Sequence, residues 1–577
     1  MKKFYKIIIT ISVVLFGAYL YVRFDALKAK DYKPDQSKST SVADMRPAII
    51  AKLQQLVKDG SGGLYRLSLD TLNVHLLSPS ADIANVSIML DSSQLNALDS
   101  AHKLPDDLFK ISVATLHIDG IELSNFLSND NFSLGKIHIT NPVIKIFHNE
   151  KWYNKGIRKL NDTLTLYQKI MKKARSISID TIEAINGTLI SYEGGESNKP
   201  NTFNNISIKI NNVLIDSSTQ YDTKRFLFAK QGFFSTKNYF GRTADSLYFY
   251  KCRYINISAT EHSMVAKDIE LVPRYSIQKF ESRLGARRAM FDITIPTITL
   301  SGIDWWNFTN RKSIIADEAV ISNLTCKIFL DRSLPFRKIK IDNYPHQLLM
   351  RMTTPVLVKK LHVSHCNLVY NEFNPGMDKI ATVYIDDMKA DVANITNMKK
   401  RVKTNRYLKV KSSGLFMHSV PMQVDFSFDL LKYKNGNFTT DLHVGAIDKA
   451  ILNPVARTSG EFFLKKGSIQ KGVVHVEGDN FKGNGHGQVL YKNLYLVELK
   501  KDKDKPGGVK KKSLLSFIGN VLLIKNNNPP NGEDPKMIDF TFERKSTSTF
   551  LNVVWGTIFT GILKTIGLPP AFGNKKY

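Results

Sequence analysis

The sequence predicts a mostly β protein: an elongated, repetitive antiparallel sheet curled into a groove, with an N-terminal transmembrane helix and a few short helices that include a C-terminal cap. Apolar residues alternate with Ser, Thr, Asn, Lys or His from Leu64 to about residue 500, at the period of two that is typical of strands. These strands follow one another at roughly ten-residue spacing. The chain has 577 residues, of which 43% are hydrophobic, so it can bury a sizeable core.

Residues 1–24 predict a membrane anchor. Lys2, Lys3 and Lys6 precede an uncharged run of sixteen residues, 7–22, which ends at Arg23. Snorkelling of the flanking cations would extend this short run to the thickness of a bilayer, with the N-terminus in the cytoplasm. A cleaved signal peptide is the alternative, although no clean cleavage site follows the run. The residues expected in the membrane include Ile7, Ile11, Val14, Leu15 and Leu20.

The body of the chain begins after a polar tether, residues 25–45. Helical periodicity is expected at residues 46–59, again at 155–174, and near 446–455. Between these helices, five stretches share one template, in which a strand leads through a polar turn or bulge into a second strand. The stretches are 112–123, 176–192, 291–305, 314–329 and 358–370. Such repeats favour an array in which each unit is stabilised by its neighbours, so we assign residues 46–445 to one repetitive groove domain and 446–500 to a further β region.

The predicted strands carry more apolar surface than the predicted helices can cover. Either the sheet folds on itself as a sandwich or barrel, or it curls into a groove whose apolar floor is covered by something other than protein, such as acyl chains. The regular repeats lack the Gly and Pro density of tight sandwich corners, which favours the groove. The candidate lining residues are Ile118, Ile137, Ile139, Ile146, Ile293, Ile295, Leu300 and Val363.

The last part of the chain, residues 501–577, combines a basic loop with apolar helices. The cluster at residues 500–512 is interrupted by Asp, Pro and Gly, which favours a solvated loop over a contact with an acidic surface. Residues 550–568 predict a terminal helix, N-capped by Ser546 or Ser548 and stopped by Pro569 and Pro570. This helix either caps the open end of the array or enters a membrane interface, and we favour the cap.

Glycines recur at every second position from Gly483 to Gly487. This spacing leaves one strand face without side chains, where another backbone or a helix can pack closely.

The sequence contains no convincing catalytic or metal-binding motif. Ser276 and Lys279 match an SxxK motif, but the companion elements of that enzyme class are missing. Cys252, Cys326 and Cys366 are too few for a disulfide framework or a metal site, so either a disulfide between Cys326 and Cys366 or buried free thiols is expected. The 13 histidines mostly occupy the polar positions of the alternating strands or loop positions. We therefore expect no catalytic, cofactor-binding or metal-binding residues and no enzymatic activity.

The net charge of +29 raises the question of an anionic partner. Lys and Arg are scattered along nearly every segment, so we expect no nucleic-acid partner.

Residues 450–499 contain more specific sequence motifs: Leu452-Asn453-Pro454, Gly478-Asp479-Asn480, the Gly-rich strand 483–487, and Tyr491-Lys492-Asn493-Leu494. This region resembles the C-terminal part of AsmA-like proteins and the related DUF748 group. The anchor and the stretches 118–123 and 139–147 are similar to the N-terminal part of the same superfamily.

The resemblance implies a bacterial inner-membrane protein with a single pass and most of its chain in the periplasm. It implies a β-rich groove related to bridge-like lipid transfer proteins, which are associated with phospholipid movement and outer-membrane integrity. The expected partners are therefore membrane phospholipid and, in the alternative of a non-catalytic structural or assembly factor, other envelope proteins. The resemblance supplies no catalytic residues.

Overall fold

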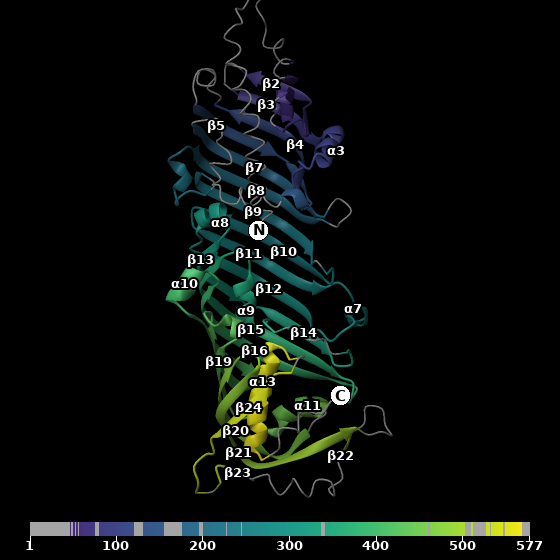
Figure 1. Cartoon of the computed structure of the whole chain (residues 1–577), viewed down its shortest axis with the longest axis vertical. Coiled ribbons are helices and arrows are strands. Elements are labelled where there is room, and N and C mark those ends of the chain that lie inside the picture. Colours follow the sequence, from purple (N-terminus) through teal and green to yellow (C-terminus); the bar gives the residue numbers. More distant parts are fainter. Residues whose placement is uncertain are drawn as a thin grey trace, which may run out of the picture. The chain divides into compact units, whose positions relative to one another are not determined.

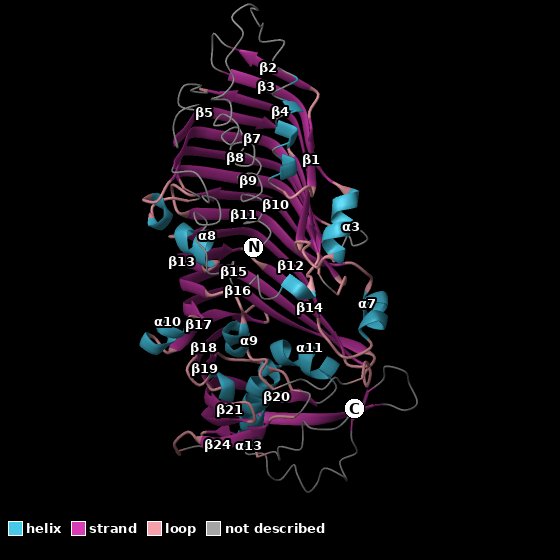
Figure 2. Cartoon of the chain, turned by 45° about the horizontal axis from the view of Figure 1, so that its top comes forward, coloured by secondary structure: helices cyan, strands magenta, loops and turns pink. Residues whose placement is uncertain are grey.

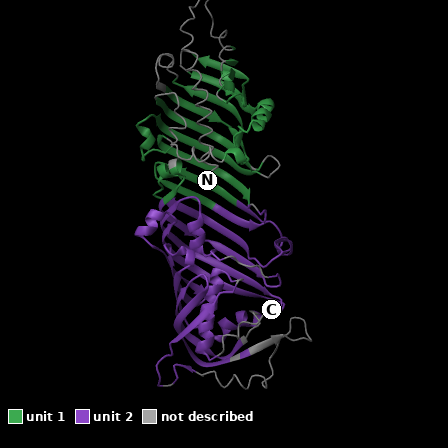
Figure 3. Ribbon diagram, in the orientation of Figure 1, with its two compact units in different colours: residues 1–242, 251–267, 301–315 green, residues 243–250, 268–300, 316–577 purple. Residues whose placement is uncertain are grey.

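A computed structural model shows a mostly β chain with a large mixed, largely antiparallel sheet and a few short helices (Figure 1; Figure 2). It describes residues 61–75, 80–120, 131–154, 176–194, 200–226, 228–243, 245–335, 341–459, 462–501, 509–511, 527–530, 532–545 and 548–567, together with residues 47, 50, 51, 53–55 and 57–59. The chain divides into two compact units, coloured separately in Figure 3: residues 1–242, 251–267 and 301–315 form unit 1, and residues 243–250, 268–300 and 316–577 form unit 2.

Unit 1 is built on a ladder of neighbouring strands. Two short strands, β1 (Tyr65–Ser68) and β2 (Thr71–His75), pair with β3 (Ser80–Leu90), which pairs with β4 (Asp107–Asp119). The ladder continues through β5 (Asn131–Thr140), β6 (Val143–His148), β7 (Ser176–Glu193), β8 (Asn201–Ile215) and β9 (Ala229–Arg242). The helical elements of this unit are α3 (Ser92–Ser100), η2 (Trp152–Asn154), η3 (Thr219–Tyr221) and α8 (Trp305–Arg311).

Unit 2 holds a second ladder. Its strands are β12 (Met290–Ser301, of which Ser301 belongs to unit 1), β14 (Thr325–Asp331), β15 (Val356–Asn374), β16 (Lys379–Thr396), β17 (Tyr407–Phe416), β18 (Val420–Asp429), β19 (Phe438–Val444), β20 (Phe462–Gly478) and β21 (Lys482–Lys501). The short strands β22 (Val509–Lys511), β23 (Asn527–Asn528) and β24 (Ile538–Glu543) pair with β21. Three further strands contribute residues to both units: β10 (Tyr248–Ser258), β11 (Ser263–Pro273) and β13 (Ile314–Ser322).

The sequence analysis expected an antiparallel sheet throughout, and this is wrong for three strand pairs. β5 and β6 both run parallel to β7, and β14 runs parallel to β15. A parallel pair requires a crossover, and alternation within a strand carries no information on the direction of its neighbour.

In unit 2, two expected helices are confirmed, and four short helical elements that were not expected are added. The helices of unit 2 are α7 (Ile277–Leu284), α9 (Pro345–Arg351), α10 (Lys399–Thr404), η4 (Tyr433–Asn435), α11 (Lys449–Ser459) and α13 (Phe550–Thr565). α11 corresponds to the helix expected near 446–455, and α13 to the terminal helix. The expected N-cap of α13 is wrong: Thr549, rather than Ser546 or Ser548, caps the helix through a reciprocal capping box with Asn552.

Bulges within strands confirm part of the repeat template. In β7 the register shifts between Ala184 and Gly187, where Asn186 has a left-handed backbone with φ of 55°. In β15 the register shifts between Val363 and Cys366, where His365 has φ of 52°. The polar side chain at the β7 bulge bonds to the turn between β5 and β6, since the Asn186 side-chain amide donates to Asn141 Oδ1 at 2.6 Å.

Several expectations fall outside the described residues: the anchor at 1–24 with Ile7, Ile11, Val14, Leu15 and Leu20, the tether at 25–45, the helix at 155–174, and most of the basic loop. The described residues between 47 and 59 are helical, as expected. Within the part of the chain that the structure describes, no helix combines the length and the apolar character needed to cross a membrane.

Candidate functional site

Cross-strand register brings the alternating apolar residues of unit 2 onto one face. Leu361 of β15 pairs with Val392, which pairs with Val410, which pairs with Phe426 of β18. In the next row, Val424 pairs with Leu442, and Leu442 with Val474 of β20. Because every second residue of a strand faces the same side, these rows form one continuous apolar face, which we call the apolar face of unit 2.

Protein covers the C-terminal strands of this face. Phe550 of α13 packs its ring 4.9 Å from that of Phe438 and 5.1 Å from that of Tyr344, which precedes α9. Val553 and Ile558 of α13 join the same cluster, as do Val474 and Val476 of β20. As a result Val474 is only 3% exposed and Val476 is fully buried.

Glycines allow α13 to approach this closely. A Cβ on Gly483 would overlap Thr557 of α13, and a Cβ on Gly556 of α13 would overlap the ring of Phe542. The side-chain-free strand face expected from the alternating glycines is therefore confirmed, and the element that packs on it is the terminal helix.

The earlier strands of unit 2 keep their apolar side chains partly exposed. Ile293 and Ile295 of β12, together with Leu300 and Val363, are half-buried. Ile293 pairs with Cys326 of β14, and Val363 pairs with Ala390 of β16. Among the described helices, none packs extensively along β14 or β15. The apolar face is thus covered by helices at its C-terminal strands and only partly covered at β12 to β15.

The remaining candidate residues lie in unit 1. Ile137 and Ile139 belong to a buried cluster against which Ile118 packs, and both are at most 5% exposed. Register explains the cluster, because Ile137 pairs with Ile118 on one side and Ile182 on the other. Ile146 of β6 is also buried. Of the residues chosen from the sequence, Ile118, Ile137 and Ile139 therefore share one apolar cluster in unit 1, Ile146 is buried elsewhere in that unit, and the others lie on β12 and β15 of unit 2.

Histidines and carboxylates pair across the strands. Nine of the 13 histidines lie within 4.0 Å of an Asp or Glu carboxylate. His117 of β4, for example, lies between Asp82 and Asp119, with N···O distances of 2.6 and 2.8 Å. The hydrogen bond to Asp82, more than that to Asp119, raises the pKa of His117, while the His117 bond lowers the pKa of Asp82. These exposed or half-exposed pairs agree with the polar positions expected for histidines.

His346 departs from that expectation. It lies in α9 with no exposed surface, its ring centroid 5.1 Å from that of Phe428. Neither ring nitrogen has a hydrogen-bond partner among the described residues. Burial lowers the pKa of His346 to about 4, so the ring is neutral at pH 7.

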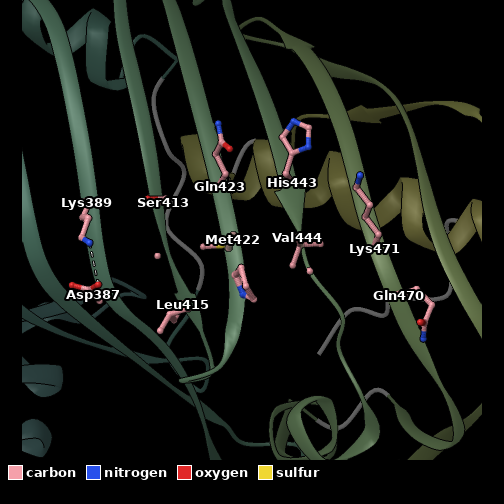
Figure 4. Close-up of a pocket in the computed structure, with 13 residues that line it drawn as sticks. Asp387, Lys389, Ser413, Leu415, Met422, Gln423, His443, Val444, Gln470 and Lys471 are labelled. Carbon is pink, nitrogen blue, oxygen red and sulfur yellow. Dashed lines mark ion pairs between the residues drawn. The ribbon is translucent and has the colours of Figure 1, made fainter.

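A hollow of about 560 Å³ in unit 2 is lined by both polar and apolar residues of β16 to β20 and the turns beside them (Figure 4). Its polar lining includes a cross-strand row, Lys389, Ser413, Gln423 and His443. Met422 and Val444, which pair across β18 and β19 and lie on the same strand side as Val424 and Leu442, also line the hollow, so its lining draws on both sides of the strands. Its one carboxylate, Asp387, already binds His365 at 2.7 Å and Lys389 at 3.5 Å.

The SxxK match lies at the start of α7. Ser276 is the N-cap of α7, and Lys279 Nζ lies 5.5 Å from the centre of the Tyr275 ring. No group of three or more His, Cys, Asp or Glu side chains among the described residues is placed to hold a metal ion. The three cysteines are free thiols, which settles the choice between free thiols and a disulfide joining Cys326 and Cys366.

Comparison with known proteins adds no relative: no protein-family model matches the chain, and no curated protein is similar to it. The fold and the candidate site therefore define the chain as a mostly β protein with an incompletely covered apolar sheet face.

Proposed function

We propose that the chain is a membrane-anchored envelope protein that handles or transports phospholipid between membranes. In this proposal the sheet curls into a groove, acyl chains lie against its apolar face, and the transfer of lipid supports the integrity of the outer membrane. The anchor holds the chain in the inner membrane of a bacterium, and most of the chain lies in the periplasm. The role is non-catalytic and requires no cofactor.

One observation carries the proposal: the contrast between the two ends of the apolar face of unit 2. Val474 and Val476 are buried beneath α13, whereas Ile293 and Ile295 of β12 and Val363 of β15 are half-buried. Removing apolar surface from water gains about 25 cal/mol per Å², so an uncovered row of Ile and Val favours an apolar ligand. An acyl chain suits such a row because each CH₂ that it buries gains about 0.8 kcal/mol.

Site-specific crosslinking tests the proposal. A photoreactive side chain is introduced at Ile295 or at Val363 in the full chain, and the purified protein is analysed by mass spectrometry for attached phospholipid. Lys360 of β15 provides the matched control, because it lies three residues from Val363 and faces the opposite side of the same strand.

We expect phospholipid adducts at Ile295 and Val363 and few at Lys360. Equal labelling at all three positions, or no lipid at the two apolar positions, would contradict acyl-chain binding. Adducts with other envelope proteins in place of lipid would instead favour the role of a structural or assembly factor.

A further inference from the structure

Several connections of unit 2 meet along one edge of its ladder. The strand ends at this edge are linked by α10 between β16 and β17, by η4 between β18 and β19, and by the turn at 479–481 between β20 and β21. α9, which precedes β15, lies beside η4. We call this set of connections the loop edge.

Hydrogen bonds hold the loop edge together. Gln347 of α9 donates to the Tyr433 carbonyl at 2.8 Å and to Asn480 Oδ1 at 3.0 Å. The Asn480 amide donates in turn to the Lys434 carbonyl at 2.7 Å. Arg406, which follows α10, donates to Asp429 at the end of β18. The connections therefore form a fixed surface rather than independent loops.

This surface is strongly basic. α10 and its neighbours present Lys399, Lys400, Arg401 and Lys403 to solvent, while Val402 is 3% exposed and anchors the helix in the core. η4 adds the exposed residues Lys432 and Lys434. None of these six cations forms an ion pair with another described residue.

The acids at the loop edge leave most of this charge unbalanced. Asp429 is 6% exposed and is already bound by Arg406, and the Asp479 carboxylate accepts the main-chain amides of Phe481 and Lys482. Asp342, which precedes α9, and Glu543, whose cross-strand partner is Lys482, are exposed acids beside these connections. The six cations thus outnumber the exposed acids.

Large apolar side chains are exposed on the same connections. Phe481 is 63% exposed, Leu348 52% and Leu431 50%, although each lies on a connection that is otherwise well packed. Apolar side chains gain no binding free energy from contact with a phosphate backbone or with water. They gain free energy at the boundary between lipid headgroups and acyl chains, where cations also meet anionic headgroups.

We propose that the loop edge is a docking surface for an anionic lipid bilayer. The cations contact anionic headgroups, and Leu348, Leu431 and Phe481 enter the interfacial layer. The proposal is independent of acyl-chain binding on the apolar face, since it depends on different residues, and either can fail without the other.

Vesicle flotation with the full chain tests the proposal. Binding is measured at physiological ionic strength to vesicles of phosphatidylcholine and to vesicles in which phosphatidylglycerol replaces part of it. The test variant carries Lys399→Gln, Lys400→Gln and Lys403→Gln. The matched control carries Lys209→Gln, Lys230→Gln and Lys237→Gln, which removes the same charge from exposed positions on β8 and β9 of unit 1. Any contribution from the rest of the chain is common to both variants.

We expect the test variant to bind anionic vesicles at least tenfold more weakly than the control, because each Lys near an anionic surface contributes a factor of about five. Phe481→Ser is expected to weaken binding more than Phe233→Ser, a change at an exposed position on β9. The thermal unfolding midpoint of each variant verifies that it is folded.

Equal binding of the two triple variants to anionic vesicles would overturn the proposal. So would full-chain binding that is the same for neutral and anionic vesicles. Loss of affinity for a duplex oligonucleotide or an acidic protein, with vesicle binding unchanged, would assign the loop edge to that partner instead.

Discussion

Gly485 and Phe540 are cross-strand partners on β21 and β24, and the ring of Phe540 fills the space that a side chain on Gly485 would occupy. The same ring also fills the space beside Gly561 of α13. Phe540 is therefore held between two glycines, one on the sheet and one on the helix that covers it. This arrangement explains why an apolar helix can lie flat on the last strands of unit 2.

Gly485→Ala should destabilise unit 2. The new Cβ overlaps Phe540, which has no room to move because Gly561 lies on its other side, so we expect a loss of about 1 to 3 kcal/mol. Denaturant unfolding measures the change. Asn484→Ala, at the adjacent exposed position of β21, is the control and should have a small effect; equal losses would show that Phe540 can move aside.

Phe550→Ala should also be costly. The ring contacts Tyr344, Phe428 and Phe438, so its removal leaves a cavity between α13 and the sheet, and we expect a loss of about 3 to 5 kcal/mol. Leu551→Ala is the neighbouring control, since Leu551 is 66% exposed. Similar unfolding midpoints for the two variants would contradict the packing of α13 on this face.

His346 should make unit 2 sensitive to acid. Its pKa of about 4 in the folded state lies below the ordinary value of 6.5, so the unfolded chain takes up a proton first as the pH falls. Stability should therefore decrease as the pH falls below about 6.5 and level off below about 4, with a total loss on the order of 3 kcal/mol from this group. Denaturant unfolding at several pH values should show a smaller acid loss for His346→Leu. An unchanged slope would indicate that the ring is solvated.

The ion pair of His117 and Asp82 should give a pH dependence opposite to that of His346: its contribution to stability is lost as the pH rises. Because folding raises the pKa of His117, this residue contributes its full stabilisation below pH 6.5, the ordinary pKa of histidine. That stabilisation is lost as the pH rises through the folded-state pKa. The lowered pKa of Asp82 makes its contribution complete above 3.8, and that contribution is lost in acid. The pair should therefore stabilise most between these two limits, although its exposure keeps the effect small.

Titration of His117 by NMR measures this coupling directly. Asp82→Asn should lower the pKa of His117 more than Asp119→Asn does, because the bond to Asp82 is the larger cause of its shift. A larger effect of Asp119→Asn would reverse the assignment of the two partners.

Val363→Asp tests the proposed acyl-chain contact without a photoreactive group. A carboxylate on the apolar face repels an apolar ligand, because a charge buried beneath an acyl chain is unfavourable. The amount of phospholipid that co-purifies with the full chain should fall severalfold, whereas Lys360→Asp on the opposite face should leave it unchanged. Loss of lipid from both variants alike would point to a charge effect unrelated to this face.

Much of the secondary structure follows from local patterns. Alternation of apolar and polar residues predicts the strands, because each strand buries one face whatever its neighbour is. The alternating glycines at 483–487 predict a close helix or backbone, and the apolar segment after residue 549 predicts α13. The residues of the candidate site, such as Ile137 and Val363, could also be chosen in this way, since they are the apolar members of clear strands.

The short helices and the buried histidine could not be found by the same reasoning. α9 and α10 each span two turns or fewer, too short to show an apolar stripe. His346 resembles the other histidines in the sequence, and only its position beneath Phe428 makes it a buried neutral group. The signal that could have indicated the loop edge is the run Lys399-Lys400-Arg401, a dense basic segment beside a buried Val402.

The sequence by itself determined that the chain is mostly β, that one face of its strands is apolar, and that a helix follows the glycine-rich strand. Tertiary structure alone decided which strands are parallel, which carboxylate meets each histidine, and which strands of the apolar face α13 covers. The physical reason is that period and propensity act between residues a few positions apart. Register, coverage and charge pairing depend instead on contacts between segments far apart in the chain, and no local pattern encodes the partner.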